Sequence, residues 1–381
     1  MIRKIGIGIV GLIAVAMLSL GAIYIFTMPE SLPDDSESQK WLQPGPYSVG
    51  SLETVFIDNS RATAENRGAA GTPERTFPTT IWYPENSSEA LPLILHSHGF
   101  TSSRSDLSYA AEHLASYGYV FAAADYPLTS GSAPGGPNAN DLLNQPADVS
   151  FLIDSVLALS TDNKPFDGEI DTSRIGLTGY SLGGLTTSIA TYHPRLRDPR
   201  ISAAASIAGL SVGFVESFYR STDIPFLMIA GTLDALVDFQ ANAAVIPKRV
   251  RNSALVSIEG GTHLGFSSLA DPLFRLMHHP DGLGCAAVLS NIDGDANDAY
   301  IPLGSERDGI VLDSSIPTVC ETMPTEKALH PGRQHMVTQI ALLAFFESVF
   351  STDELIRQQA KQQLQHSLSA EMPEASYTEQ I

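Results

Sequence analysis

A serine between glycines, in Gly179-Tyr180-Ser181-Leu182-Gly183, is the clearest chemical feature of the sequence. A predicted strand, Arg174 to Thr178, precedes it, and a run with helical spacing, Leu182 to Tyr192, follows it. A nucleophilic serine needs such a sharp strand-to-helix turn, because the turn exposes its hydroxyl at the sheet edge and small residues two positions away avoid clashes. The context predicts that Ser181 is a nucleophile.

A serine hydroxyl is a weak nucleophile at its ordinary pKa, so a base and an orienting acid must stand elsewhere in the chain. After this type of turn they follow in the order acid, then histidine, each beyond a later strand. Asp234 follows the predicted strand Pro225 to Ala230, and His263 follows the predicted strand Ala254 to Ile258. Their positions predict that Ser181, Asp234 and His263 form a catalytic triad.

Other acids and histidines compete for these roles. Asp238 lies one helical turn after Asp234, but it would begin the next helix. Asp125 also ends a strand, yet it precedes the serine and is expected to cap a loop. Five further histidines stand in polar, helical or cap-like contexts: His193, His278, His279, His330 and His335.

Two backbone N–H groups are expected to stabilise the negative charge that develops on an attacked carbonyl oxygen. Leu182 follows the serine at a helix amino terminus, where the partial charge is positive. Phe100 follows a predicted strand and the turn His96-Ser97-His98-Gly99, whose glycine lets the chain bend toward the serine. We therefore predict an oxyanion hole formed by the amides of Phe100 and Leu182.

His96 and His98 also have the spacing of two metal ligands on one face of a strand. No carboxylate or cysteine stands nearby at a fitting spacing, so these histidines are expected to shape their loop. The sequence predicts neither a metal nor a cofactor.

The elements around these residues alternate between strands and helices. Helical periodicity marks Leu107 to Tyr117, Ala147 to Leu159 and Leu182 to Tyr192. Such alternation predicts an α/β class with a mostly parallel sheet, helices on both faces and an antiparallel start. The eight runs that predict strands are Leu52 to Ile57, Thr79 to Tyr83, Leu91 to His96, Tyr119 to Ala124, Arg174 to Thr178, Ala203 to Ile207, Pro225 to Ala230 and Ala254 to Ile258.

The periodic pattern sets the expected domain limits. A catalytic domain is predicted over 47–350, ending in a helix from His335 to Val349. Within it, residues 264–334 are rich in Pro, Gly and Asp and predict a cap-like insertion, here called the cap segment. The polar, Gln-rich tail 351–381 is predicted to be disordered.

The amino terminus has the pattern of a membrane-targeting segment. Arg3 and Lys4 precede an uncharged stretch from Ile5 to Met28, whose 24 residues suffice to span a bilayer as a helix. An uncleaved signal anchor and a removed signal peptide both remain open. Either predicts export of the main domain, joined in the first case through a Pro- and Ser-rich linker over 29–46.

The two cysteines and the charge agree with export of a soluble domain. Cys285 and Cys320 stand 35 positions apart, which in an exported protein suggests a disulfide; two buried thiols are the alternative. The formal net charge of −20 argues against nucleic acid as a partner, because phosphate binding needs Lys and Arg. The sequence does not indicate an oligomeric state.

From about Leu52 to Val349 the chain resembles the α/β-hydrolase superfamily. Within it, the chain is similar to the branch of dienelactone-hydrolase-like and platelet-activating-factor-acetylhydrolase-like enzymes, which includes bacterial polyester hydrolases and cutinases. The resemblance implies a carboxylic ester hydrolase with Ser181, Asp234 and His263 as triad. The motifs that carry it are Ile81-Trp82-Tyr83-Pro84, His96-Ser97-His98-Gly99-Phe100, Leu114-Ala115-Ser116-Tyr117-Gly118-Tyr119-Val120 and Gly179-Tyr180-Ser181-Leu182-Gly183-Gly184.

The chain departs from the branch at three points. Its nucleophile is a serine where true dienelactone hydrolases use cysteine, so their substrate is not carried over. Polyester hydrolases of the branch carry a tryptophan after the strand that follows the nucleophile, where this chain has Ala208-Gly209-Leu210-Ser211-Val212. Small cutinase-like enzymes also lack a long cysteine-bearing segment after the histidine.

These observations predict a serine esterase that acts on small or lipid-like esters. A phospholipid or platelet-activating-factor-type acetylhydrolase and a cutinase-like polyester hydrolase are the alternatives. A non-catalytic, membrane-tethered binding protein on the same scaffold is the interpretation from another class.

Overall fold

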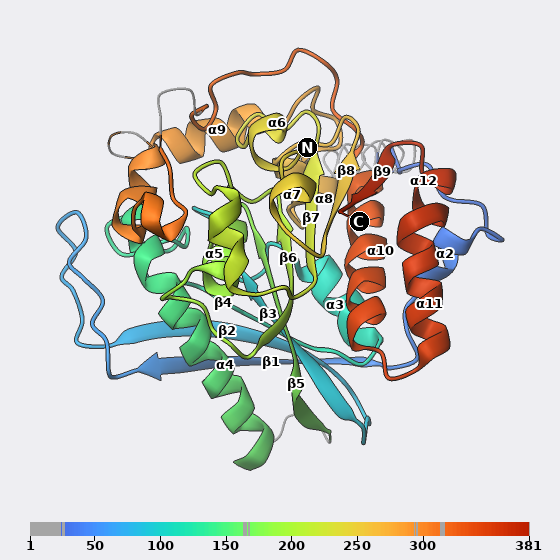
Figure 1. The fold of residues 1–381 in the computed structure, drawn as a ribbon, viewed down its shortest axis with the longest axis horizontal. Coiled ribbons are helices and arrows are strands. Elements are labelled where there is room, and N and C mark those ends of the chain that lie inside the picture. Colours follow the sequence, from blue (N-terminus) through green and yellow to red (C-terminus); the bar gives the residue numbers. More distant parts are fainter. Residues whose placement is uncertain are drawn as a thin grey trace, which may run out of the picture.

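The computed structural model describes Tyr24 and residues 27–380, apart from 163–165, 167, 293, 295 and 313–316. In this part of the chain, one mixed sheet of nine strands has the order β1-β2-β4-β3-β5-β6-β7-β8-β9 (Figure 1). The strands are β1 (Val49–Asp58), β2 (Arg75–Pro84), β3 (Ala90–Ser97), β4 (Val120–Ala124), β5 (Glu169–Tyr180), β6 (Ile201–Ile207), β7 (Phe226–Gly231), β8 (Ser253–Ile258) and β9 (Ala375–Glu379).

Helices precede, cover and follow this sheet. The α-helices are α2 (Glu37–Leu42), α3 (Ser108–Ser116), α4 (Gln145–Asp162), α5 (Leu182–Tyr192), α6 (Phe239–Asn242), α7 (Ile246–Arg249), α8 (Ala270–Phe274), α9 (Asp281–Leu289), α10 (Pro331–Phe350), α11 (Glu354–Gln362) and α12 (Leu368–Glu371). Short 3-10 turns and one π turn complete them: η1 (Ala139–Asn144), η2 (Glu216–Ser221), η3 (Leu264–Phe266), η4 (Ala296–Leu303), η5 (Glu306–Asp308) and η6 (Gln363–Ser367).

The strand directions confirm the predicted mixed sheet. β1 and β2 run antiparallel to their neighbours, whereas β4, β3, β5, β6, β7 and β8 are parallel in that order. β1 to β8 overlap the eight predicted runs, and β9 adds a ninth strand that runs antiparallel to β8. The carboxyl ends of β5, β7 and β8 therefore meet at one edge of the sheet.

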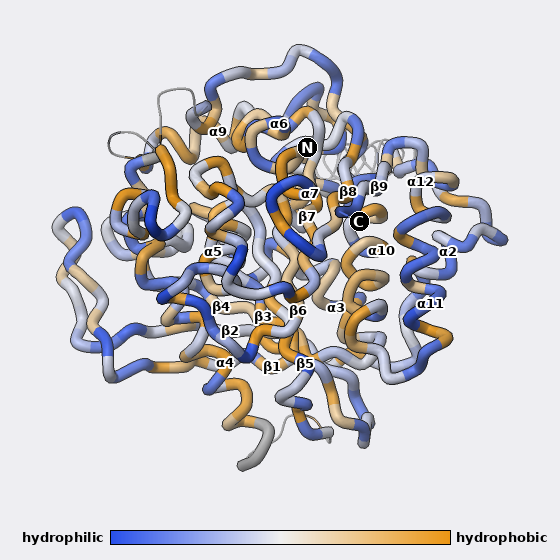
Figure 2. The backbone as a smooth tube through the Cα atoms, in the orientation of Figure 1, coloured by the Kyte–Doolittle hydropathy of each residue, from blue (hydrophilic) through white to orange (hydrophobic). Residues whose placement is uncertain are grey.

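Alternating side chains of the strands fill two hydrophobic cores. On β3, Leu93 and Leu95 pack in the core with α4 and α5, while Ile94 packs in the opposite core with α3 and α10. The central strands are apolar on both faces, as a sheet covered on both sides requires. Figure 2 shows apolar residues gathered along these strands and the helix faces against them.

The cap segment lies over the carboxyl edge of the sheet (Figure 1). Its residues Tyr300, Leu303 and Ile310 are buried in the same core as α5, and Ile310 forms an antiparallel bridge with Phe214. The predicted disulfide between its two cysteines is present. The segment is thus built into the core of the domain.

The prediction of a disordered tail is wrong. Residues beyond Phe350 form α11, η6 and α12 and end in β9, and they bury Ala360, Leu364 and Leu368. These three residues recur every four positions and form a narrow apolar stripe on otherwise polar helices. Average composition hides such a stripe, because the surrounding glutamines dominate it.

The segment 29–46, predicted as a linker, also packs on the body. Leu32 is buried, and α2 begins at the N-cap Ser36. The carboxylate of Glu371 on α12 accepts hydrogen bonds from the N–H groups of Glu37 and Ser38, at 3.0 and 2.7 Å. The tail therefore holds the amino-terminal segment in place.

The predicted membrane segment, Ile5 to Met28, lies outside the described residues except for Tyr24, Thr27 and Met28. Among the residues that are described, no helix combines the length and the apolar character needed to cross a membrane.

Two leucines of the tail test whether it folds in solution. Leu368 is fully buried, whereas Leu355 is 68% exposed. Leu368→Ala should lower the free energy of unfolding by about 2–5 kcal/mol, the usual cost of emptying a buried leucine site. Leu355→Ala is the matched control and should leave it nearly unchanged. Equal urea midpoints for both variants would contradict a packed tail.

Candidate active site

Ser181 occupies the sharp turn between β5 and α5. Its backbone has φ 57° and ψ −117°, a conformation that costs a non-glycine residue about 1–3 kcal/mol. The Ser181 N–H donates to the carbonyl of Ile207 on β6 at 2.9 Å, which helps to hold the turn. The hydroxyl is thereby presented at the carboxyl edge of the sheet, as the sequence motif predicts.

The neighbouring glycines allow the turn to pack tightly. A Cβ atom on Gly183 would lie 1.9 Å from the carbonyl oxygen of Ser97, at the end of β3. A Cβ atom on Gly179 would lie 2.1 Å from the carbonyl oxygen of Gly183. Glycine is required at both positions because backbone, rather than a movable side chain, fills the space.

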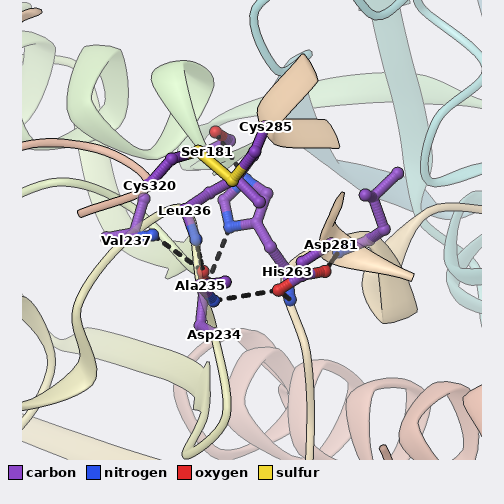
Figure 3. The surroundings of a disulfide bond; sticks show 10 residues. Ser181, Asp234, Ala235, Leu236, Val237, His263, Asp281, Cys285 and Cys320 are labelled. Carbon is purple, nitrogen blue, oxygen red and sulfur yellow. Dashed lines mark hydrogen bonds and ion pairs between the residues drawn. A yellow bond between two sulfur atoms is a disulfide. The ribbon is translucent and has the colours of Figure 1, made fainter. Parts of the chain in front are cut away.

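The structure brings together the three residues of the predicted triad (Figure 3). The Nε2 atom of His263 lies 2.8 Å from Ser181 Oγ, and its Nδ1 atom lies 2.7 Å from Asp234 Oδ2. Because a carboxylate only accepts hydrogen bonds, Nδ1 carries the proton and Nε2 is free to accept one from the serine. His263 and Asp234 are buried, so the bond between them is shielded from water, while Ser181 is partly exposed.

The loop after β7 holds the acid. The second oxygen of Asp234, Oδ1, accepts hydrogen bonds from the N–H groups of Leu236 and Val237, at 2.9 and 2.7 Å. These bonds fix the orientation of the carboxylate toward His263. Asp238, the competing acid, instead caps α6 by accepting from the N–H of Ala241 at 2.7 Å.

The charges around His263 favour its protonated form. Burial lowers the pKa of the imidazole, but the carboxylates of Asp234 and Asp281 outweigh burial, so the pKa lies above its ordinary value. Tyr180 donates its hydroxyl to the carbonyl of His263 at 2.9 Å, and its ring packs against the imidazole. Burial raises the pKa of Tyr180, which keeps it a neutral donor.

Phe100 stands in the loop after β3, close to the serine turn. A Cβ atom built on the preceding Gly99 would lie 3.3 Å from Ser181 Cβ, which places this loop beside Ser181. Within the described part of the chain, neither the N–H of Phe100 nor that of Leu182 donates to another residue. Both amides are available to an oxygen atom bound next to Ser181.

Side chains behind the loop hold its shape. Asp106 accepts hydrogen bonds from the Gly99 N–H at 2.9 Å and from His96 Nε2 at 2.8 Å. His98 Nδ1 donates to the Gly99 carbonyl at 2.7 Å, while its Nε2 accepts from the N–H of Tyr126 at 3.0 Å. Burial lowers the pKa of His98, in keeping with this neutral tautomer. The two histidines thus have the loop-shaping contacts expected for them.

The remaining competitors have structural contacts elsewhere. Asp125, directly after β4, accepts from the N–H of Arg104 at 2.7 Å and so caps the loop that follows β3. His193 binds the carbonyl of Leu303 at 2.8 Å, and His335 binds that of Ser267 at 3.0 Å. None of these contacts involves the serine turn.

One buried carboxylate next to the triad has no counterpart in the sequence predictions. Asp281, the first residue of α9 in the cap segment, is fully buried and accepts hydrogen bonds from the backbone of the two loops that carry Asp234 and His263. Burial and the charge of Asp234 raise its pKa. The aperiodic segment around it offered no signal, since hydrogen bonds to main-chain N–H groups leave no sequence pattern.

The cap segment also supplies an apolar wall beside this loop. Ala235, Leu236 and Val237 pack against the Cys285–Cys320 disulfide (Figure 3). Leu210, in the loop where the branch's polyester hydrolases carry tryptophan, contacts the same cluster. This small apolar group packs the cap segment against the acid loop.

The fold and this arrangement of serine, histidine and aspartate define an α/β-hydrolase. A family model described as PET hydrolase-like matches residues 57–275, more than half of the chain. The chain belongs to this PET hydrolase-like family, and it is a serine carboxylic ester hydrolase.

Curated relatives include several cutinases. Cutinase est1 of Thermobifida alba is 25% identical over 236 residues, which cover 61% of this chain and 68% of that protein. A cutinase of Thermobifida fusca (strain YX) is 25% identical over 237 residues, covering 61% and 67%. The bis(hydroxyethyl) terephthalate hydrolase of Streptomyces coelicolor is 28% identical over 153 residues, covering 40% of this chain and 41% of that protein.

The raised pKa of His263 predicts the pH dependence of hydrolysis. If the neutral imidazole is the base, kcat/KM should rise with pH and level off above an apparent pKa higher than the ordinary histidine value of about 6.5. This rising part of the pH profile is called the acidic limb. Asp234→Asn should lower kcat by on the order of 10⁴ and move this acidic limb to lower pH, because it removes a neighbouring negative charge. A pH-stat with a soluble short-chain ester measures both effects.

Asp238→Asn is the matched control for that experiment, since Asp238 stands in the same loop and caps α6. It should keep the parental rate and acidic limb. A larger loss of kcat in Asp238→Asn than in Asp234→Asn would assign the role of acid to Asp238.

Proposed function

We propose that Ser181, His263 and Asp234 hydrolyse carboxylic esters through an acyl-enzyme. The observation that carries this proposal is the chain of hydrogen bonds from Asp234 through His263 to Ser181, at 2.7 and 2.8 Å. Its place at the carboxyl edge of the sheet supports the same role, as do two adjacent backbone N–H groups that have no acceptor among the described residues.

In the first half of the reaction, His263 Nε2 takes the proton of the Ser181 hydroxyl as Oγ bonds to the ester carbonyl carbon. The carbonyl oxygen becomes negative and accepts hydrogen bonds from the amides of Phe100 and Leu182. His263 then gives its proton to the departing alcohol as the ester C–O bond breaks. The products of this half are the alcohol and a serine ester.

In the second half, His263 takes a proton from water, and the resulting hydroxide bonds to the acyl carbon. The same amides hold the oxyanion, and the proton returns from His263 to Ser181 Oγ as the acid leaves. Asp234 keeps the proton on Nδ1 and stabilises the imidazolium in both halves. Loss of one oxyanion donor costs about 2.7–4 kcal/mol in comparable sites, so the two amides are central to the rate.

Ser181→Ala tests the nucleophile. Its kcat for p-nitrophenyl acetate should fall by on the order of 10⁶, the size of loss found when a triad serine is removed. Ser188→Ala is the matched control. Ser188 is a buried serine on α5, the helix that follows Ser181, and its hydroxyl has no hydrogen-bond partner in the described structure. A fluorophosphonate should label the parent and Ser188→Ala but not Ser181→Ala. Parental turnover by Ser181→Ala would rule the mechanism out.

The substrate class is proposed as small or lipid-like esters, with polyesters as the alternative. Relatives named as cutinases and as a bis(hydroxyethyl) terephthalate hydrolase support the polyester alternative. Leu210 stands in the loop where the branch's polyester hydrolases carry a tryptophan, and this difference favours aliphatic over aromatic acyl groups.

A surface feature favours lipid-like substrates. The cap segment contains several large apolar residues that are exposed, among them Leu269, Leu273 and Leu276 around α8. Arg275 lies over the ring of Tyr24, at 4.2 Å from its centroid, so Tyr24 lies against the body beside α8. We propose that the protein is exported and that Ile5 to Met28 anchors it, which would bring these leucines to a bilayer.

Paired assays with monomeric and micellar esters test the lipid-like substrate. The double variant Leu273→Ser/Leu276→Ser should lose several-fold in kcat/KM on a micellar long-chain ester, because apolar surface drives contact with an interface. Its rate on monomeric p-nitrophenyl acetate should stay parental. Leu355→Ser, a change of an equally exposed leucine on α11, serves as control. An unchanged micellar rate in the double variant would contradict the lipid-like assignment.

A further inference from the structure

We infer that Asp281 is a positioning residue for ester hydrolysis, which holds the acid loop and the histidine loop in register through their backbones. It comes from α9 of the cap segment and not from any strand of the sheet (Figure 3). The inference rests on the proposed roles of Asp234 and His263.

The contacts of Asp281 reach both loops. Its Oδ2 atom accepts hydrogen bonds from the N–H of Ala235 and from the N–H of His263, each at 2.9 Å. Its Oδ1 atom accepts from the N–H of Leu264 at 2.8 Å. One carboxylate therefore binds the residue after the acid, the histidine itself and the residue after the histidine.

This arrangement bears directly on the bond between the acid and the base. The strand pairing of β7 with β8 ends at Gly231 and Ile258, before either side chain. A further backbone bond joins Leu233 to Gly261 at 2.9 Å, again before the two functional residues. Beyond that point, in the described structure, Asp281 is the group that bridges the two backbones. A shift of either loop would lengthen the 2.7 Å contact between Asp234 and His263.

The surroundings of Asp281 suit a charged carboxylate. All three of its partners are N–H donors, which only the ionised group satisfies in full. It also stands in the first turn of α9, where a negative charge is stabilised by the helix dipole. Its charge adds to that of Asp234 in favouring the imidazolium of His263, the form present during acyl transfer.

The disulfide fixes the helix that carries Asp281. Cys285 lies one turn further along α9 and is bonded to Cys320. The Cys320 N–H points to the carbonyl of Leu236 in the acid loop, at 3.4 Å. The cross-link thus holds α9 and the acid loop together, so that the carboxylate of Asp281 keeps its position relative to that loop.

Asp281→Asn tests the inference, because asparagine keeps the size but removes the charge and one acceptor. Its kcat should fall by about 10²-fold with KM nearly unchanged, the loss expected from a misplacement of about 1 Å at a reacting pair. The acidic limb of kcat/KM should also move to lower pH. Rates are expressed per site titrated with a fluorophosphonate, so that partial unfolding does not imitate the effect.

Two further variants define the outcome. Asp308→Asn, a change of another carboxylate in the cap segment that binds Arg195, should keep parental values. Asp281→Glu restores the charge with a longer side chain, so it should keep the parental acidic limb while kcat stays reduced. The double variant Cys285→Ser/Cys320→Ser should lose part of kcat and move the acidic limb in the same direction as Asp281→Asn.

The inference would be overturned if Asp281→Asn kept the parental kcat per titrated site and the parental acidic limb. This holds even if fewer sites were titrated. Should that variant not fold, Asp281→Glu decides, and a parental kcat there would overturn it as well. Both results differ from failure of the triad proposal, which would appear as turnover by Ser181→Ala.

Discussion

The close approach of backbone to backbone at the Ser181 turn is the constraint on which the site depends. Gly183 lies so near the carbonyl oxygen of Ser97 that no side chain fits between them. This contact joins the start of α5 to the end of β3, and so sets the Leu182 amide beside the loop that carries Phe100. The strained backbone of Ser181 is kept in place by this contact and by the hydrogen bond from its N–H to Ile207 on β6. Ser181 and the Leu182 amide are in this way positioned by main chain, while the side chains of Asp106 and His98 hold the loop that carries Phe100.

Electrostatics gives the opposite half of the site its stability. Two carboxylates, Asp234 and Asp281, are buried close to one imidazole, and repulsion between them would disfavour the arrangement. Five backbone N–H groups of the two loops and α9's amino-terminal position offset that cost. The charges of Asp234 and Asp281 also raise the pKa of His263. The two carboxylates that bind the loop backbones therefore also stabilise the imidazolium.

How much could be predicted from the sequence depends on how far apart in the sequence the interacting residues lie. The strands of the sheet were predicted because each buries an apolar run of its own, and the positions of Ser181, Asp234 and His263 followed from the strand ends. The tail was mispredicted because its apolar residues, such as Leu364 and Leu368, are few and meet their partners, α10 among them, only in the folded chain. Asp281 was missed because its partners are main-chain N–H groups brought near by folding, and any acidic residue of the cap segment looks alike in the sequence.

The position of Asp281 also limits how the cap segment can move. The match to the PET hydrolase-like family ends at residue 275, so Asp281 and the disulfide lie outside the matched region. A segment added over an active site often acts as a lid that opens for substrate. Here a large opening would pull the carboxylate from His263 and Leu264, and it would also remove Tyr300 and Ile310 from the core they share with α5. The cap segment is therefore expected to stay closed over the acid and histidine loops while the ester is bound and hydrolysed.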